Sequence, residues 1–149
     1  MLPELTTNQK GALAETKIVA AAIELGIHVY RPVGEGGRCD LLFDLNGPLV
    51  RVQCKWAAKR GNVLAVPCYS ARRTRDGLAR RFYTSDEIDA YAAYCRELDQ
   101  SYFLWMSEVA GRSRVQLRLA PTRNNQLARV HWAKDYEFAA TLCRKSLGP

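Results

Sequence analysis

Apolar and polar residues alternate along the two runs of sequence that flank Asn46-Gly47. An Asn-Gly pair between such runs is a strong signal for a β-hairpin with a two-residue turn. The turn sets the register, so Leu41 is expected opposite Val52, and Asp40 opposite Gln53 with Lys55 diagonal to it. The apolar face, which we expect in the core, carries Leu41, Phe43, Leu45, Val50, Val52, Cys54 and Trp56. The polar face carries Asp40, Asp44, Arg51, Gln53 and Lys55.

A helix is predicted from Asn8 to Leu25, because its apolar residues recur with helical spacing. Thr6 or Thr7 would cap its N-terminus, and Gly26 would end it. Glu15 lies nearly opposite the solvent-facing stripe of this helix on a helical wheel. That stripe consists of Lys10, Lys17 and Glu24.

The rest of the chain alternates between predicted strands and helices. Residues 63–68, after the Gly61-Asn62 turn, and residues 114–120 are predicted strands, the second half-exposed. The apolar run 101–107 is predicted to be a central strand. Thr84 and Glu87 have the spacing of a capping box, which predicts a helix through Glu97. A closing helix is predicted over 135–145, with an inner stripe of Tyr136, Ala139, Ala140 and Cys143.

Glu15 raises a chemical question, because an unpaired carboxylate on an inner helix face is costly to bury. If the helix lies near the hairpin, Glu15 would point towards Asp40 and Lys55. Oxygen donors of this kind suit a hard divalent cation such as Mg²⁺, for which Mn²⁺ can substitute. Such a cation polarises phosphate and activates water, and a lysine stabilises developing negative charge.

These four residues then take separate catalytic roles. Asp40 would be the principal metal ligand, Gln53 a neutral oxygen ligand, and Glu15 a carboxylate acting directly or through water. Lys55 would be the cationic catalyst. The alternative interpretation is a solvated sheet surface with a cross-strand Asp44–Arg51 pair.

Four sequence phrases resemble the PD-(D/E)XK nuclease superfamily, and more narrowly its group I intron-associated homing endonuclease branch. They are "NQKGALAETKIVAAAIELG" with Glu15, "RVQCKWA" with Gln53 and Lys55, "EIDAYAAYC" and "LRLAPTRNNQ", and "RCD" ending in Asp40 joins them. The resemblance extends from about Thr6 to Leu142. It implies an α/β fold with a restriction-endonuclease-like α-β-β-β-α-β core, in which helices flank a mixed central sheet. It also implies metal-dependent, site-specific hydrolysis of phosphodiester bonds in duplex DNA.

The chain departs from the superfamily pattern at two positions. Cys39 stands where the motif has proline, which has no chemical role. Gln53 stands where most relatives have Asp or Glu, so metal affinity depends more on Glu15 and Asp40. Glutamine at this position is the usual form in the homing branch, which favours an active enzyme.

Length and composition are consistent with a single endonuclease domain spanning 1–149. The chain has 149 residues, of which 48% are hydrophobic, enough for one proper core. Its N-terminus lacks a signal-peptide pattern and no apolar run is long enough to cross a bilayer, so we expect a cytoplasmic protein without a membrane partner. The five cysteines are widely spaced without a CxxC pair, which predicts reduced thiols rather than disulfides or a zinc site.

Positive charge is concentrated between Lys55 and Arg81. This segment has eight basic residues and one acidic residue, a net +7 that equals the formal charge of the whole chain. Such a cluster favours contact with a nucleic-acid backbone, although charge alone does not distinguish DNA from RNA. "SARRTRDGLARRFY" is predicted to be a loop that becomes ordered on binding; the alternative is a solvated basic loop. The expected DNA contacts here are Lys59, Arg60, Arg72, Arg73, Arg75, Arg80 and Arg81.

"PTRNNQ", residues 121–126, is a second candidate for DNA recognition. Arginine can read guanine, and Asn and Gln amides can read adenine edges, in the major groove. The candidate readers are Arg123, Asn124, Asn125 and Gln126. Such residues also occur in loops simply because they favour turns.

The expected partner is double-stranded DNA, cut by at least a homodimer, because cleavage of both strands is simplest with two symmetry-related active sites. The resemblance to the homing branch implies a homotetramer as the alternative. Two alternatives stay open. One is a structure-selective nuclease like the Holliday-junction resolvases. The other is a DNA-binding module that has lost catalysis because Gln53 weakens metal binding.

Overall fold

The computed structural model describes residues 2–122, 124 and 130–146. Its centre is a five-stranded sheet with the order β1-β2-β3-β8-β9. Within it β3 and β8 run parallel, whereas the other neighbouring strands are antiparallel, so the sheet is mixed. The strands are β1 (His28–Tyr30), β2 (Leu41–Asp44), β3 (Leu49–Trp56), β8 (Ala90–Cys95) and β9 (Gln100–Trp105).

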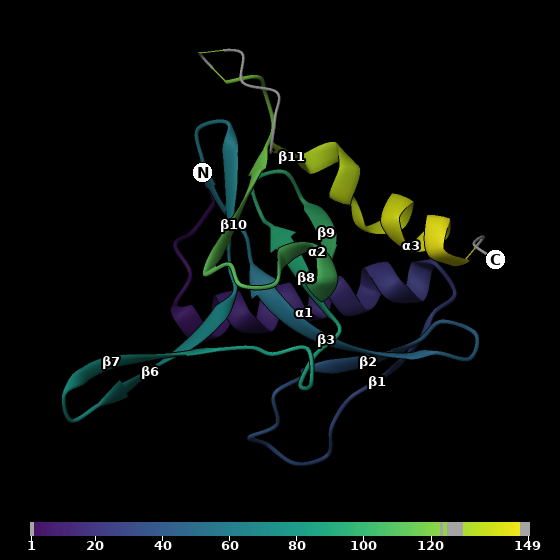
Figure 1. The fold of residues 1–149 in the computed structure, drawn as a ribbon, viewed down its shortest axis with the longest axis horizontal. Helices are drawn as coiled ribbons and strands as arrows, with labels where there is room; N and C mark the ends of the chain where they lie inside the picture. The colour runs from purple at the N-terminus through teal and green to yellow at the C-terminus, as the bar shows by residue number, and fades with distance from the viewer. Residues whose placement is uncertain (1, 123, 125–129, 147–149) are drawn as a thin grey trace.

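Two helices cover one face of this sheet, as Figure 1 shows: α1 (Thr7–Glu24) and α3 (Phe138–Ser146). A second sheet, with the order β11-β10-β5-β4, covers the other face. Its strands are β4 (Ala58–Arg60), β5 (Val63–Pro67), β10 (Arg114–Arg118) and β11 (His131–Trp132). Short helices α2 (Met106–Val109) and η1 (Ala133–Tyr136) join these parts. This α/β architecture confirms the predicted mixed central sheet with flanking helices.

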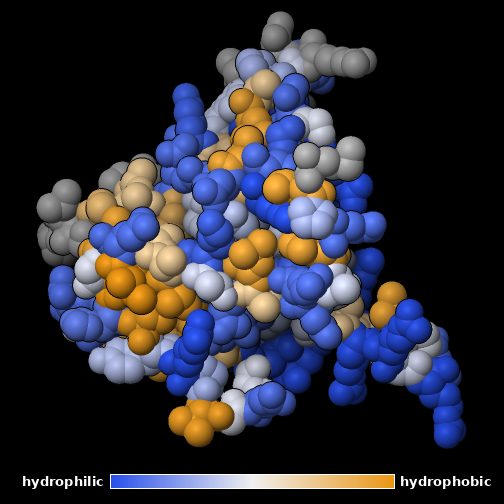
Figure 2. Space-filling view, turned by 180° about the vertical axis from the view of Figure 1, so that it is seen from behind, coloured by the Kyte–Doolittle hydropathy of each residue, from blue (hydrophilic) through white to orange (hydrophobic). Residues whose placement is uncertain are grey.

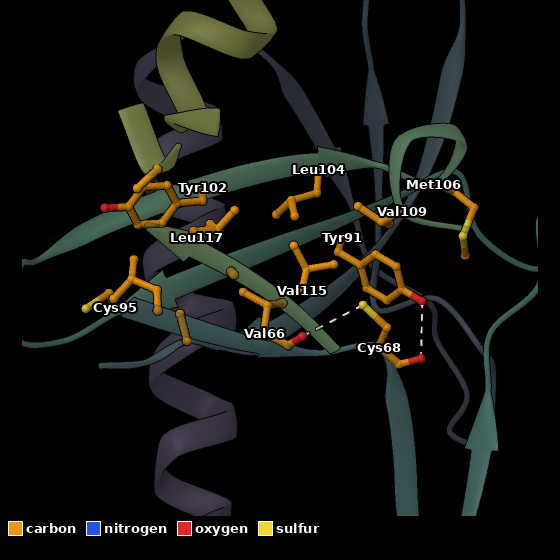
Figure 3. Packing of buried hydrophobic residues seen from close by; sticks show 14 of the residues in the cluster. Val66, Cys68, Tyr91, Cys95, Tyr102, Leu104, Met106, Val109, Val115 and Leu117 are labelled. Atoms are coloured by element: carbon orange, nitrogen blue, oxygen red, sulfur yellow. Dashed lines mark hydrogen bonds between the residues drawn. The ribbon is translucent and has the colours of Figure 1, made fainter. Parts of the chain in front are cut away.

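The core has two layers, one on each side of the central sheet. Ile18 of α1 and Phe43 and Phe103 of the sheet belong to the helix-side layer. Figure 3 shows the other layer, where Tyr91 and Leu104 face side chains of the second sheet. The residues of the second sheet labelled there are Val66, Val115 and Leu117. The α1 helix packs only on the helix-side layer, so it does not cover the polar side chains on the opposite face of β3.

The predicted hairpin and first helix are confirmed in detail. Leu41 pairs with Val52 and Phe43 with Val50, as the Asn46-Gly47 turn requires. Asn46 and Gly47 adopt φ of 60° and 129°, the region that this turn needs. The α1 helix has Thr6 as its N-cap in a capping box with Gln9, and Gly26 follows it with φ 78°.

The helix predicted over 84–97 is wrong. Thr84 and Glu87 do make the contacts of a capping box, the Glu87 carboxylate accepting from the Thr84 amide at 3.1 Å. Residues 90–95 nevertheless form strand β8, which is buried throughout. Its side chains enter the two core layers alternately, so both faces are apolar and the run has no strand-like alternation.

The apolar strand β9 is confirmed, but it lies at the edge of the central sheet rather than at its centre. It is buried because α3 and η1 pack against it, with a bridge between Tyr102 and Glu137. Strands β5 and β10 confirm the predictions for residues 63–68 and 114–120, with slightly narrower bounds.

The closing helix differs from its prediction. Residues 133–136 form the 3-10 helix η1, and α3 starts only at Phe138. Phe138, Thr141 and Leu142 form its buried side, while the predicted stripe residues Ala139, Ala140 and Cys143 are exposed. The buried stripe differs from the predicted one because the chain breaks at Glu137. The α3 helix therefore presents other residues to the core than a continuous helix over 135–145 would.

The arginine-rich segment predicted as a loop is a β-hairpin of β6 (Tyr69–Thr74) and β7 (Gly77–Phe82). It projects from the lower left of the body in Figure 1, and Figure 2 shows it from behind as a largely hydrophilic arm at the lower right. Both of its faces are exposed over most of its length, so no apolar alternation marks it in the sequence.

Cys39, Cys54, Cys68 and Cys95 are free thiols, of which Cys68 and Cys95 are buried, and Cys143 is exposed. No helix among residues 2–122, 124 and 130–146 is long and apolar enough to cross a membrane.

Candidate active site

Asp40 lies immediately before β2, at the end of the central sheet. Its amide donates to the Val52 carbonyl at 2.9 Å, and its Oδ2 accepts from the Cys54 amide at 3.0 Å. These bonds fix the carboxylate against β3. Burial raises the pKa of the Asp40 carboxyl, an effect that the Cys54 hydrogen bond offsets only in part. The charge of Glu15 raises this pKa further and that of Lys55 lowers it, so both residues act on Asp40.

Lys55 is held on the face of β3 that lies away from α1. Its Nζ donates to the Tyr69 carbonyl at 2.7 Å and to the Tyr83 hydroxyl at 3.4 Å. The ammonium also lies 4.9 Å from the centre of the Tyr83 ring. Burial lowers the pKa of Lys55, and the nearby carboxylate of Asp40 opposes this effect. The predicted proximity of Asp40 and Lys55 is therefore present in the fold.

Glu15 reaches the site from the other side of the sheet. The α1 helix packs in the same core layer as Cys54, whereas Gln53 and Lys55 alternate with it and point away. Glu15 is half-buried, with its side chain 35% exposed, and its Oε1 lies 3.4 Å from Nε of Arg31, which supplies the cation that an inward-facing carboxylate needs. The charge of Glu15 raises the pKa values of Asp40 and Cys54.

Gln53 lies on β3 between Val52 and Cys54, the two residues whose backbone groups bond Asp40. In the parallel ladder it pairs with Tyr91 and Lys55 pairs with Ala93, so both side chains share one face of the sheet. The amide of Gln53 is half-buried. This placement fits the predicted role of a neutral oxygen donor near Asp40.

The alternative cross-strand pair on this hairpin does not form. Arg51 lies opposite Leu42, and its Nη2 bonds Asp89 Oδ1 at 3.0 Å instead of reaching Asp44. Asp44 accepts from the Gly47 amide at 3.1 Å within the turn. The polar face is therefore divided between a structural ion pair with Asp89, the residue before β8, and the group around Asp40.

Sequence reasoning missed Arg38 and Tyr83. Arg38 lies two residues before Asp40, with its guanidinium 4.0 Å from the centre of the Tyr83 ring. It donates to Ser70 Oγ at 3.1 Å and to the Phe82 carbonyl at 2.8 Å, which ties the base of the β6–β7 hairpin to the site. The sequence signal for Arg38 is its place in the phrase "RCD". Its contacts could not be predicted, because they join residues far apart in the sequence.

The residues around Asp40 fit a divalent cation better than a zinc-type centre. Within the described part of the chain, no three His, Cys, Asp or Glu side chains gather to hold a metal. Two carboxylates and an amide are hard oxygen donors, which suit Mg²⁺ or Mn²⁺ with water in the remaining positions. The pKa of Asp40 is raised because burial disfavours its charged form, and a bound cation would favour that charged form.

The expected DNA-contacting residues fall on three elements. Arg72, Arg73, Arg75, Arg80 and Arg81 belong to the projecting hairpin and are exposed. Lys59 and Arg60 are exposed on β4, an edge strand of the second sheet. Asn124 is exposed, and its Oδ1 accepts from Thr122 Oγ1 at 2.7 Å. Arg123, Asn125 and Gln126 lie outside the described residues.

The mixed sheet, with an acidic group and a lysine at the ends of β2 and β3, is an arrangement suited to cutting phosphodiester bonds. The sequence model of the PD-(D/E)XK endonuclease family matches residues 5–139, so the chain belongs to this family. Nucleases of this family typically use divalent metals.

A solved bacterial homing endonuclease, I-Ssp6803I, is similar in structure, with a TM-score of 0.74 and 26% sequence identity. The match covers 95% of this chain and 95% of that chain. A comparison with curated proteins finds no match. The family and this structural neighbour place the chain among the DNA endonucleases.

Proposed function

We propose that this protein is a Mg²⁺-dependent, site-specific endonuclease of duplex DNA, of the homing type, with the whole chain acting as one catalytic domain. The observation that carries the proposal is the juxtaposition of Asp40 and Lys55, each of which alters the pKa of the other. The sequence resemblance assigns both residues to the family's motif, and the match to the family model and the likeness to a homing endonuclease support that assignment. Mn²⁺ is expected to substitute for Mg²⁺.

The cation, when bound, neutralises phosphate charge and makes a bound water a better nucleophile. Asp40 and Gln53 would hold it, with Glu15 acting directly or through water. The hydrogen bond from the Cys54 amide fixes Asp40 Oδ2 and thereby the orientation of the carboxylate. The neutral amide of Gln53 adds a donor oxygen without adding charge repulsion.

Lys55 would stabilise negative charge that develops on the scissile phosphate. An ammonium group has three hydrogen-bond donors, and the Tyr69 carbonyl and Tyr83 hydroxyl account for two of them. The third can reach a non-bridging phosphate oxygen. The same two partners restrict the lysine side chain, which lowers the entropy lost when it engages substrate.

The basic β6–β7 hairpin would bind the DNA backbone beside the cut. Arg72, Arg73 and Arg75 are exposed on it and form no ion pair with described residues, which leaves their charges available to phosphate. Arg81 contributes less, since its Nη2 lies 3.3 Å from Glu87 Oε2. We expect a homodimer or homotetramer, which supplies a second active site for the other strand.

The test is to sequence every DNA end that the protein creates. Fragmented genomic DNA of the source organism and a randomised duplex library are incubated with protein and Mg²⁺. Asp40→Ala and a chelator serve as negative controls. Asp44→Asn is the matched control, because Asp44 is a carboxylate of the same hairpin that bonds only the turn.

We expect ends that recur at one sequence with the wild type and with Asp44→Asn, and that vanish in both negative controls. Cleavage of four-way junctions without a recurring sequence would replace this proposal with a structure-selective nuclease. Tight, salt-sensitive DNA binding without new ends on either substrate would contradict catalysis and favour a binding module.

A further inference from the structure

The outer face of the second sheet is built from long polar side chains on one strand. Along β10, Arg114 and Gln116 are exposed and Arg118 is half-buried, while Val115 and Leu117 between them are fully buried. The buried pair faces the central sheet, so the other three point away from the body. This face belongs neither to the active site nor to the arginine-rich hairpin.

The neighbouring strand β5 forms a low floor beside these side chains. Cross-strand partners lie on the same face, and the partners of the three β10 residues are all small and apolar. They are Pro67, Ala65 and Val63, opposite Arg114, Gln116 and Arg118 respectively. On the far side of β5, Arg60 of β4 pairs with Val63. The small side chains of β5 leave this part of the sheet flat, and the long cationic and amide side chains of β10 and β4 stand on either side of it. A large, regular ligand can therefore lie close to the sheet between them.

The charge of this face is positive. The four strands of the second sheet contain neither Asp nor Glu, and on this face they present Arg60, Arg114 and Arg118. Among the described residues none of these three arginines forms an ion pair. The face continues into a depression of about 410 Å³, lined in part by Arg112, Arg114, Gln116, Arg118, Thr122 and His131. Such a surface attracts a polyanion.

The face starts beside the candidate active site. Pro67, the partner of Arg114, is followed by Cys68 and then by Tyr69, whose carbonyl accepts from Lys55. The Cys68 amide in turn donates to the Ser113 carbonyl at 3.0 Å, which fixes the Arg114 end of β10 against this corner. From Arg114 to Arg118 the strand advances about 13 Å, the length of about four base pairs.

We infer that this face is a second DNA-contact surface, which reads base pairs on one side of the scissile phosphate; the inference rests on the proposed function. Arg114 is assigned to a guanine and Gln116 to an adenine, through bidentate bonds in the major groove. Their spacing of two strand residues, about 6.6 Å, corresponds to about two base pairs. Arg60 supplies charge to a phosphate at the edge of the groove.

Arg118 takes a supporting role in this assignment. Its Nε donates to the Ala120 carbonyl at 3.1 Å and its Nη2 reaches the Pro121 carbonyl at 3.5 Å. The guanidinium is therefore engaged with the chain that leaves β10, which positions residues 120–122 next to the reading face.

The test is a binding selection from a duplex library with 30 random base pairs (roughly three turns of helix), run in chelator so that no DNA is cut. Wild type is compared with Gln116→Ala, Arg114→Lys and the matched control Arg73→Ala, which removes a hairpin charge. Gln116 and Arg114 are exposed, so these variants should fold, which circular dichroism and thermal melting verify.

We expect Gln116→Ala to lower the preference at one base pair about tenfold and to leave other positions unchanged. Arg114→Lys should relax a guanine preference about two base pairs away, because lysine lacks the planar fork. Arg73→Ala should weaken binding equally for all sequences and reduce the slope of log K against log salt by about 0.9.

Unchanged sequence preference in both β10 variants, with a sequence-selective wild type, overturns this inference and leaves the proposed endonuclease intact. Wild-type protein that selects no sequence, or does not bind DNA, overturns both.

Discussion

Replacement of Arg38 by methionine should loosen the β6–β7 hairpin while leaving the rest of the fold in place. Methionine keeps most of the length of the side chain but removes every polar contact. The guanidinium donates to Glu87 Oε2 at 2.8 Å, to Ser70 Oγ at 3.1 Å and to the Phe82 carbonyl at 2.8 Å. Its stacking on Tyr83 is lost as well.

The size of the effect follows from these contacts. The Arg38 and Glu87 side chains are only 18% and 21% exposed, so solvent screens their pair weakly. Hydrogen bonds from a charged donor contribute about 1.5–3 kcal/mol each. The variant loses these contributions but also avoids the cost of removing the guanidinium from water, which offsets part of the loss. We expect the free energy of opening the hairpin to fall by about 2–3 kcal/mol, which raises its open population about 30- to 140-fold.

Hydrogen exchange with mass spectrometry measures this opening directly. Amides of residues 69–82 should exchange about 30- to 140-fold faster in Arg38→Met, while those of β8 keep the wild-type rate. Arg72→Met is the matched control, because Arg72 is exposed on the same hairpin and forms no ion pair among the described residues. Equal exchange of the hairpin in Arg38→Met and wild type would refute the idea that Arg38 anchors it.

Two further predictions concern stability and metal binding. The hydrogen bonds with Arg51 lower the pKa of Asp89 in the folded protein below its ordinary value of 3.8. The charged carboxylate therefore stabilises the fold above about pH 4, and this stabilisation is lost as the pH falls through the folded-state pKa. Asp89→Asn should therefore cost about 1 kcal/mol at pH 7 after solvent screening, and urea denaturation should show this difference shrinking below pH 4; a pH-independent difference would contradict it. Gln53→Glu adds a negative donor beside Asp40 and should tighten Mn²⁺ binding, seen as loss of the free-ion electron paramagnetic resonance signal, whereas unchanged binding would exclude Gln53 as a ligand.

The residues of the candidate site could be found from sequence where a short-range rule fixes their geometry. The Asn46-Gly47 turn determines the register of β2 against β3, and the register alone places Asp40, Gln53 and Lys55 near one another. The first helix was predictable for the same reason, since its cap and stop signals are local.

Features that depend on tertiary packing could not be found in this way. The face of the sheet that α1 covers is set by the whole fold, so the sequence predicted that Glu15 lies near Asp40 but not which face of β3 its helix covers. Strand β8 looked helical because both of its faces are buried. The β6–β7 hairpin has the opposite property. Both of its faces are exposed, so only Asp76 and Gly77 at its turn signal a hairpin in the sequence.

The most direct test of the central claim separates DNA binding from DNA cutting at Asp40. Single-turnover cleavage of the mapped target is measured in Mg²⁺ for wild type and Asp40→Asn, together with the affinity of each for the same duplex. The amide keeps an oxygen that can accept from the Cys54 backbone, so the fold is retained. We predict that Asp40→Asn binds the target at least as tightly as wild type and does not cut it. Cleavage by Asp40→Asn at the wild-type rate would contradict the assignment of this site.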